Sequence, residues 1–358
     1  MNQKKDGVRG IPSPTFACLP PQGRKPVPDP ERLDHFMARA AAAYYAGRDP
    51  FGARGDFITA PEISQAFGEC LGLWAAVVWQ QMGAPAVVHL AECGPGRGTL
   101  MADALRAIGG VMPEFRAALR LHLVETSPAL RDAQRAALGE ATWHDTLATL
   151  PDGPLILLGN EFLDALPIRQ FIRRGTGWME RFVRDGGFVE QPAGAPALPA
   201  TAPEGEIREW GEAAEALVAA LAARLATQGG AALFLDYGPA ASGPGDSLQA
   251  LSRHGAADPL GPPGEADITA HVDFAALARA AGAQGATAHG PVPQGLFLQS
   301  LGLVSRAAML ARAAPRTAGL QLSAAQRLVA PEGMGRLFKA LALCHPGQPV
   351  PPGFEGNA

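Results

Sequence analysis

A short apolar run and the glycine-rich turn after it decide the fold: Ala86-Val87-Val88-His89-Leu90-Ala91-Glu92-Cys93-Gly94-Pro95-Gly96-Arg97-Gly98. The nearly continuous apolar character of residues 86–91 is typical of a central parallel strand that is covered on both faces. Apolar side chains then recur at helical spacing over residues 99–108. A strand, a glycine turn and a helix in this order predict a nucleotide-binding unit, because the turn lets the backbone approach a ligand and the helix start offers free N–H groups.

The same alternation continues downstream. Further apolar runs predict strands at residues 121–124, 143–145, 155–158 and 232–235, and a helix is expected at residues 127–138. Alternating strands and helices indicate an α/β fold with a doubly wound, mostly parallel, seven-stranded Rossmann-like sheet. Late strands and a C-terminal helix at residues 334–343 would complete it.

The chain divides into a core and several additions. Residues 1–30 are polar and proline-rich and are expected to form a flexible leader, and residues 31–85 a helical cap over the cofactor. One helix is predicted at residues 30–45 and another from Thr59 through Val78, with Thr59 as its N-cap. The core comprises residues 86–168 and 230–358. Residues 169–229 are predicted as an inserted hairpin and helix that contact substrate, and residues 239–272 as a lid-like insertion.

Composition excludes several classes of protein. Hydrophobic residues make up 47% of the 358 residues, charged residues 18%, and the net charge is -4. This acidic balance does not favour nucleic acid as a partner. No apolar run is long enough to span a membrane, and no secretory signal is present, so we expect a cytoplasmic protein. The four cysteines form no metal-binding or disulfide pattern, and buried free thiols are expected, with no metal.

The glycine spacing indicates which ligand the turn binds. Dinucleotide sites use G-x-G-x-x-G, whereas here Gly94, Gly96 and Gly98 alternate after the acidic Glu92. That form is found in sites for S-adenosylmethionine, whose ammonium suits a carboxylate and whose carboxylate suits backbone N–H groups. Glu125, at the end of the next predicted strand, is placed to accept both ribose hydroxyls.

Three more residues are candidate cofactor contacts. Asn160 ends the predicted strand at residues 155–158. His144 and Asp145 stand where adenine-contacting residues would lie, although an ordinary loop pair is an equal alternative.

Two carboxylates indicate the chemistry at the neighbouring strand end. Glu161 and Asp164 follow the run at residues 155–158, and a helical turn would place both on one face. Paired carboxylates can hold a guanidinium and align its nitrogen with the methyl group of a sulfonium. The alternative is that Asp164 caps a helix and Glu161 alone faces the cleft. Asp236, Tyr237 and His271 are candidate substrate-binding residues in the same region.

Five ordered motifs resemble those of the MidA-type methyltransferases, the bacterial relatives of the mitochondrial complex I assembly methyltransferase. They lie at residues 55–64, 92–101, 160–167, 235–238 and 264–274. The resemblance covers roughly residues 49–343, and before Asp49 the sequence departs from the family pattern.

The resemblance implies a class I methyltransferase fold with a substrate-domain insertion and S-adenosylmethionine as cofactor. It also implies methyl transfer to an arginine of a protein partner, with a complex I subunit as the target in the mitochondrial relative. The segment at residues 55–64 would fold over the cofactor, which makes Thr59 and Pro61 candidate contacts. A homodimer is left open.

Three alternatives remain at this point. The chain could bind the cofactor as an assembly factor without catalysis. It could be a nicotinamide oxidoreductase, although the glycine spacing expected for that class is absent. It could also methylate a small molecule or RNA, because a fold does not fix a substrate.

Overall fold

The computed structural model describes residues 29–45, 59–194, 198–252 and 255–356. The predicted leader therefore lies almost entirely outside the described residues, as do residues 55–58 of the segment expected over the cofactor. Within the described ranges, no helix is long and apolar enough to cross a membrane.

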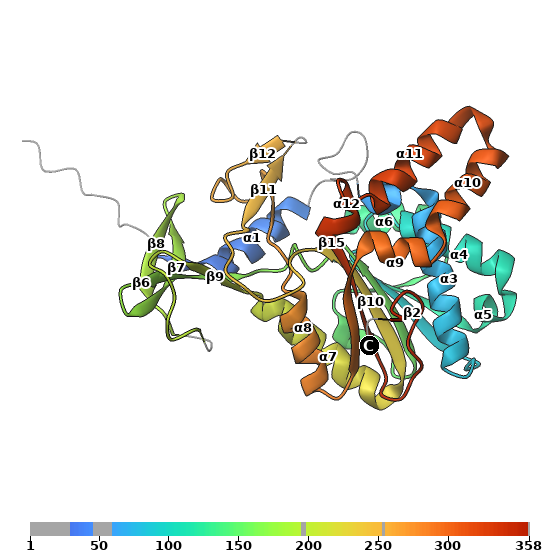
Figure 1. Cartoon of the computed structure of the whole chain (residues 1–358), viewed down its shortest axis with the longest axis horizontal. Helices are drawn as coiled ribbons and strands as arrows, with labels where there is room; N and C mark the ends of the chain where they lie inside the picture. The colour runs from blue at the N-terminus through green and yellow to red at the C-terminus, as the bar shows by residue number, and fades with distance from the viewer. Residues whose placement is uncertain (1–28, 46–58, 195–197, 253–254, 357–358) are drawn as a thin grey trace, which may run out of the picture.

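A seven-stranded sheet forms the centre of the molecule (Figure 1). Its order is β14 (Thr287–Pro293), β15 (Phe338–Cys344), β10 (Gly230–Tyr237), β5 (Leu155–Asn160), β2 (Val88–Cys93), β3 (Leu119–Val124) and β4 (Thr142–His144). The strands from β10 to β4 pair in parallel, whereas β15 runs antiparallel to both of its neighbours. The predicted fold class, a mostly parallel seven-stranded α/β sheet, is confirmed.

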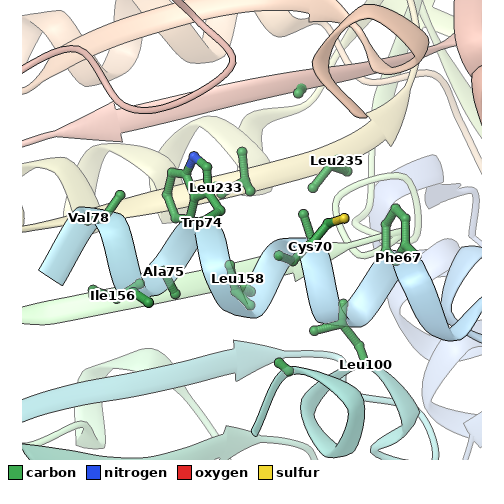
Figure 2. Close-up of a cluster of buried hydrophobic side chains, with 14 of the residues drawn as sticks. Phe67, Cys70, Trp74, Ala75, Val78, Leu100, Ile156, Leu158, Leu233 and Leu235 are labelled. Atoms are coloured by element: carbon green, nitrogen blue, oxygen red, sulfur yellow. The ribbon is translucent and has the colours of Figure 1, made fainter. Parts of the chain in front are cut away.

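Helices cover both faces of this sheet. On one face lie α3 (Gln65–Gln81) and α4 (Thr99–Val111), which pack on β5 and β10 through the buried side chains in Figure 2. On the other face lie α7 (Glu212–Gln228) and α8 (Phe274–Ala283). The remaining helices of this part are α5 (Pro113–Ala118) and α6 (Pro128–Leu138).

Two smaller sheets stand beside the core. The predicted hairpin is present as β6 (Arg169–Arg174) and β7 (Gly177–Arg184). These strands pair with β1 (Glu31–Arg32), β8 (Gly187–Pro192) and β9 (Ile207–Trp210) to form a five-stranded sheet. The insertion at residues 239–272 contains β11 (Gln249–Ser252), β12 (Gly255–Ala257) and β13 (Asp267–Thr269). Helix α1 (Leu33–Tyr45) packs against this insertion and β7 through Leu33, Phe36 and Met37.

Two predictions of secondary structure were wrong. The helix expected at residues 334–343 is only α12 (Met334–Leu337), and Phe338–Cys344 is the antiparallel strand β15. Its alternating Ala and Leu side chains favour a helix, but burial between β10 and β14 decides otherwise. The long helix expected from Thr59 is divided into α2 (Ala60–Ile63) and α3, because Ser64 is extended, with φ −147°.

The C-terminal part contains a helical arrangement that the sequence did not indicate. Helices α9 (Gln294–Ser300), α10 (Leu303–Ala313) and α11 (Ala318–Val329) follow β14 and pack on the α3 side of the sheet. Of the four cysteines, Cys70, Cys93 and Cys344 are buried free thiols, as expected, and Cys18 lies outside the described residues.

Candidate functional site

The glycine turn connects β2 to α4 at the carboxyl edge of the sheet. Gly94, Gly96 and Gly98 have φ values of 61°, 52° and 83°, a region that side chains other than glycine rarely adopt. A Cβ atom on Gly94 would also lie 3.1 Å from the Phe162 ring. The turn is therefore restricted to glycine by its conformation, and it lines a pocket beside the start of α4.

Glu92 lies at the base of this turn as a buried carboxyl group. Its side chain is 3% exposed, and its Oε2 atom has no hydrogen-bond partner in the part of the chain that the structure describes. Burial raises the pKa of Glu92 to about 8. A buried acceptor without a partner is costly, so this arrangement favours a cationic ligand in the pocket that Glu92 lines.

Helix α2 covers the same pocket. Thr59 and Pro61 line it together with the glycine turn, where they were predicted. Two hydrogen bonds hold α2 there: Thr99 Oγ1 donates to Glu62 Oε1 (2.5 Å), and the backbone N–H of Ala60 donates to Glu161 Oε1 (3.0 Å). The second bond links the cover of the pocket directly to a predicted catalytic carboxylate.

Glu125 directly follows the last residue of β3, at the strand end where the sequence indicated it. Its side chain is 8% exposed, and its Oε1 atom accepts a hydrogen bond from the backbone N–H of Ser127 (2.7 Å). The guanidinium of Arg131 donates to the carbonyl oxygen of Glu125 and to Asp145 Oδ1 (2.6 Å). Arg131 thus joins the ends of β3 and β4, a role that no sequence pattern indicated.

His144 and Asp145 do not share one environment. Both ring nitrogens of His144 are bonded inside the protein, Nε2 to His122 (3.0 Å) and Nδ1 to Thr149 Oγ1 (2.9 Å). The side chain of Asp145 is 77% exposed beside Arg131. Of the predicted pair, Asp145 is therefore the residue that we keep as a proposed adenine contact.

Asn160 and Glu161 end β5 next to the glycine turn, and both line the Glu92 pocket. Asn160 Nδ2 donates to Glu161 Oε1 (3.1 Å), while the buried Oδ1 atom of Asn160 has no partner within residues 29–45, 59–194, 198–252 and 255–356. Glu161 has a φ of 49°, unusual for a side chain other than glycine. Burial, with a smaller contribution from Asp164, raises the pKa of Glu161 to about 7.

Asp164 follows in a turn and not in the helical turn expected from the spacing. Its side chain is buried, and no described residue bonds its Oδ1 atom. Burial raises the pKa of Asp164 to about 6. Asp236 fixes this turn, because its Oδ2 atom accepts hydrogen bonds from the backbone N–H groups of Phe162, Leu163 and Asp164.

Tyr237 and His271, both predicted to bind substrate, lie beside the turn. The Tyr237 hydroxyl donates to Thr269 Oγ1 (2.7 Å) and accepts from Gln249 Nε2 (3.2 Å). The exposed His271 ring contacts Tyr237 edge-on, with 5.6 Å between ring centroids. His271 lines a second cavity of about 350 Å³, which it shares with Glu209 and Asp273, and it does not line the Glu92 pocket.

Two further residues of the site escaped the sequence interpretation. Tyr45, at the end of α1, donates to Asp267 Oδ1 (3.1 Å), and burial raises its pKa well above the usual value. Gln134 on α6 is fully buried beside the glycine turn. Its place on the apolar face of α6, four residues from both Leu130 and Leu138, was the available signal.

The residues of this pocket fit S-adenosylmethionine. Glu92 Oε2 and Asn160 Oδ1 are buried acceptors without partners in the pocket lined by the glycine turn, which suits an ammonium group. Backbone N–H groups at the start of α4 suit a carboxylate. Glu125 and Asp145 lie on the neighbouring strand ends, where the nucleoside would be held.

Comparison with known proteins agrees with this geometry. Residues 70–292 match the family model Methyltransf_28, described as "Putative S-adenosyl-L-methionine-dependent methyltransferase". The chain is 36% identical to the Drosophila melanogaster homolog of the mitochondrial protein arginine methyltransferase NDUFAF7, over 89% of this chain and 81% of that protein. It is 34% identical to human NDUFAF7, over 89% and 80%.

A solved structure shows the same fold with a ligand. A COG1565 superfamily member from Burkholderia thailandensis, bound to S-adenosyl-homocysteine, is 29% identical to this chain, with a TM-score of 0.78. The match covers 91% of this chain and 90% of that one. The cofactor of this chain is S-adenosylmethionine, and the chain belongs to the MidA/NDUFAF7 family of S-adenosylmethionine-dependent methyltransferases.

Proposed function

We propose that this methyltransferase transfers methyl groups to an arginine of a protein partner. The observation that carries the proposal is the pair of carboxyl groups of the partly buried Glu161 and the buried Asp164, which follow β5. Each has a pKa raised toward neutrality, to about 7 and about 6 respectively, chiefly by burial. The relatives named protein arginine methyltransferases support the same acceptor.

A guanidinium ligand would satisfy both groups. Asp164 Oδ1 has no partner among the described residues, and the hydrogen bonds that Glu161 accepts from Ala60 and Asn160 both end on its Oε1 atom. A planar guanidinium offers several N–H donors in a fixed arrangement, so it can engage two carboxylates at once. Its charge would favour ionisation of both carboxyl groups. The two carboxylates would in turn lower the free-energy cost of burying the guanidinium.

The proton balance assigns a second task to these residues. S-adenosylmethionine supplies the methyl group from its sulfonium. As the arginine nitrogen forms its bond to carbon, it loses one N–H proton and the methylated guanidinium keeps its single charge. Glu161, whose pKa burial raises to about 7 in the ligand-free protein, is kept ionised by the bound guanidinium and is suited to accept this proton and release it to solvent after the product leaves.

The partner itself is proposed from the family resemblance. It is a protein, and a subunit of a complex I-type respiratory assembly is the first candidate. We propose the five-stranded sheet of β1, β6, β7, β8 and β9 as the substrate region and the cytoplasm as the place of the reaction.

Tritium-methyl labelling tests the acceptor. The purified chain and S-adenosylmethionine with a tritiated methyl group are added to a lysate of source cells that lack the gene. The expected result is a labelled protein whose hydrolysate contains methylated arginine. Label in RNA or a small molecule would contradict the proposal, and cofactor binding without any label would favour the assembly-factor alternative.

Three variants connect the activity to the carboxylates. Glu161→Gln and Asp164→Asn should each lower labelling by about 100-fold or more. Both should bind S-adenosylhomocysteine within a few-fold of the unchanged protein. Glu114→Gln, an exposed carboxylate on α5, is the matched control. Full labelling by Glu161→Gln would overturn the assigned role.

A further inference from the structure

Gln134 is a fully buried amide that contacts the glycine turn and Glu125 at once. Its Nε2 atom donates to the carbonyl oxygen of Gly96 (2.7 Å), within the glycine turn. The same nitrogen lies 3.4 Å from Glu125 Oε2. On its other side, Gln134 Oε1 accepts a hydrogen bond from the indole N–H of Trp143 (2.8 Å).

These partners fix the orientation of the amide. An indole N–H can only donate and a backbone carbonyl can only accept, so the oxygen of Gln134 must face Trp143 and the nitrogen must face Gly96. The two N–H hydrogens then serve Gly96 and Glu125. Every polar atom of this side chain has a partner, in contrast to Glu92 and Asn160 in the same pocket.

The consequence for Glu125 is a fixed orientation of its carboxylate. The backbone N–H of Ser127 donates to Oε1 and Gln134 Nε2 donates to Oε2, and the backbone N–H of Thr126 also bonds the carboxylate. A carboxylate held in this way can present its remaining lone pairs to neighbouring hydroxyls in a set direction. The bond to Gly96 holds the glycine turn at a set distance from the same carboxylate.

We propose that Gln134 is a positioning residue of the cofactor site, which acts through Glu125 and Gly96 on the ribose end of S-adenosylmethionine. It touches neither the cofactor nor the acceptor. Its removal should weaken cofactor binding by freeing Glu125 and the glycine turn, without changing the groups that bind the cofactor directly.

A double-mutant cycle with Glu125 tests this role. Titration calorimetry with S-adenosylhomocysteine should show an affinity about 10- to 100-fold lower for Gln134→Leu than for the unchanged protein. If Gln134 acts through Glu125, the same change should cost only a few-fold in a Glu125→Gln background. An equal loss in both backgrounds, or no loss in either, would overturn the proposal.

The variant Gln134→Glu gives an independent readout if Gln134→Leu does not fold. In its protonated form, the introduced carboxyl group can donate to Gly96 and accept from Trp143, as the amide does. The ionised form would repel Glu125 and could not donate. Because Glu92 imposes a pH dependence of its own, the informative quantity is the affinity of Gln134→Glu for S-adenosylhomocysteine divided by that of the unchanged protein at the same pH. This ratio should fall by at least about 10-fold as the pH rises from 6 to 8, and a ratio that stays constant would contradict the role assigned to Gln134.

The indole of Trp143 reports on the ligand-free protein. Its N–H resonance, assigned with Trp143→Phe, should shift in Gln134→Leu, and in Gln134→Glu it should shift with pH over the range in which the affinity changes. If affinity changes while this resonance stays fixed, the loss does not arise from the network of Gln134, and the proposal fails.

Discussion

The Oδ2 atom of Asp236 lies 2.8 Å from the backbone nitrogen of Leu163, in the turn that carries Asp164. The same oxygen accepts from the two flanking N–H groups, and Asp236 Oδ1 accepts from the backbone of Tyr237. Asp236 is 1% exposed. The sequence indicated Asp236 as a candidate substrate contact. We propose instead that it holds the turn that carries Asp164 in place and so orients the acceptor site.

The change Asp236→Ala tests this support. It would leave the N–H groups of Phe162, Leu163 and Asp164 without partners in a buried turn. Each such group costs about 1–3 kcal/mol, so we expect the free energy of unfolding to fall by about 3 kcal/mol or more. Urea unfolding measures this loss. Because the glycine turn is held separately, affinity for S-adenosylhomocysteine should fall far less than methylation. Unchanged stability would show that the turn does not need Asp236.

Glu92 should couple cofactor binding to proton release. Its pKa, raised to about 8 by burial, keeps most of it protonated at pH 7 in the ligand-free protein. An ammonium beside it favours the ionised form, so binding should release nearly one proton at pH 7. Affinity should then increase with pH from 6 to 7.5. Calorimetry with S-adenosylhomocysteine in phosphate and in Tris measures the released proton through the ionisation enthalpy of the buffer.

The matched variant for this measurement is Glu92→Gln. It should bind more weakly and release no proton. Without ligand it should be more stable than the unchanged protein above pH 8. The sign follows from the raised pKa: the stability contributed by protonated Glu92 is present below about pH 4.5 and is lost as pH rises to about 8. Equal binding enthalpies of the unchanged protein in both buffers would contradict the coupling.

Three histidines form a row across the sheet, from β2 through β3 to β4. His122 Nε2 lies 2.9 Å from His89 Nδ1, and its Nδ1 lies 3.0 Å from His144 Nε2. Burial, with the nearby charges of the other rings and Arg224, lowers the pKa of His122 to about 4. Between pH 6.5 and 4 the unfolded chain therefore binds a proton at this position that the folded chain does not. Stability should fall as the pH falls through this window.

The measurement compares His122→Gln with the unchanged protein by urea unfolding at pH 7, 6 and 5. The carboxyl groups with raised pKa, such as Glu161, act in the opposite direction over part of this range, so the difference between the two proteins is the informative quantity. The destabilisation caused by the substitution should shrink as the pH is lowered. A difference that stays constant with pH would show that His122 does not titrate as described.

The sequence predicted the parts of the site that depend on local pattern. The strand expected at residues 86–91 is present as β2 (Val88–Cys93), two residues further along the chain, and the glycine turn and Glu125 follow their strands as the apolar runs and glycine spacing indicated. The sequence singled out Asp236 but did not indicate that it supports the turn that carries Asp164, because its partners lie 72 to 74 positions away in the chain. Predicting the row of three histidines would have required the order of β2, β3 and β4 in the sheet as well as the positions of these strands in the sequence.

Strand β15 shows the other limit. Phe338–Cys344 contains alternating Ala and Leu, which are good helix formers, and only its place between β10 and β14 makes it a strand. Gln134 has a related explanation. A polar residue on an apolar helix face indicates a buried hydrogen bond, but the sequence does not say that Gly96 and Trp143 are its partners.

The contact between α3 and α4, which places the glycine turn against the cap, depends on Gly72. A Cβ atom there would lie 2.6 Å from Ala104 Cα and 2.7 Å from the Ala104 carbonyl oxygen, both backbone atoms that cannot rotate away. We expect Gly72→Ala to lower the free energy of unfolding by about 1–3 kcal/mol.

Gly109→Ala on α4 is the matched control, because nothing lies within 4 Å of its Cβ position. By helix propensity that change should be neutral or stabilising by up to about 1 kcal/mol. Urea unfolding of both variants should give opposite or clearly unequal changes, whereas similar losses would show that packing between α3 and α4 does not distinguish the two glycines.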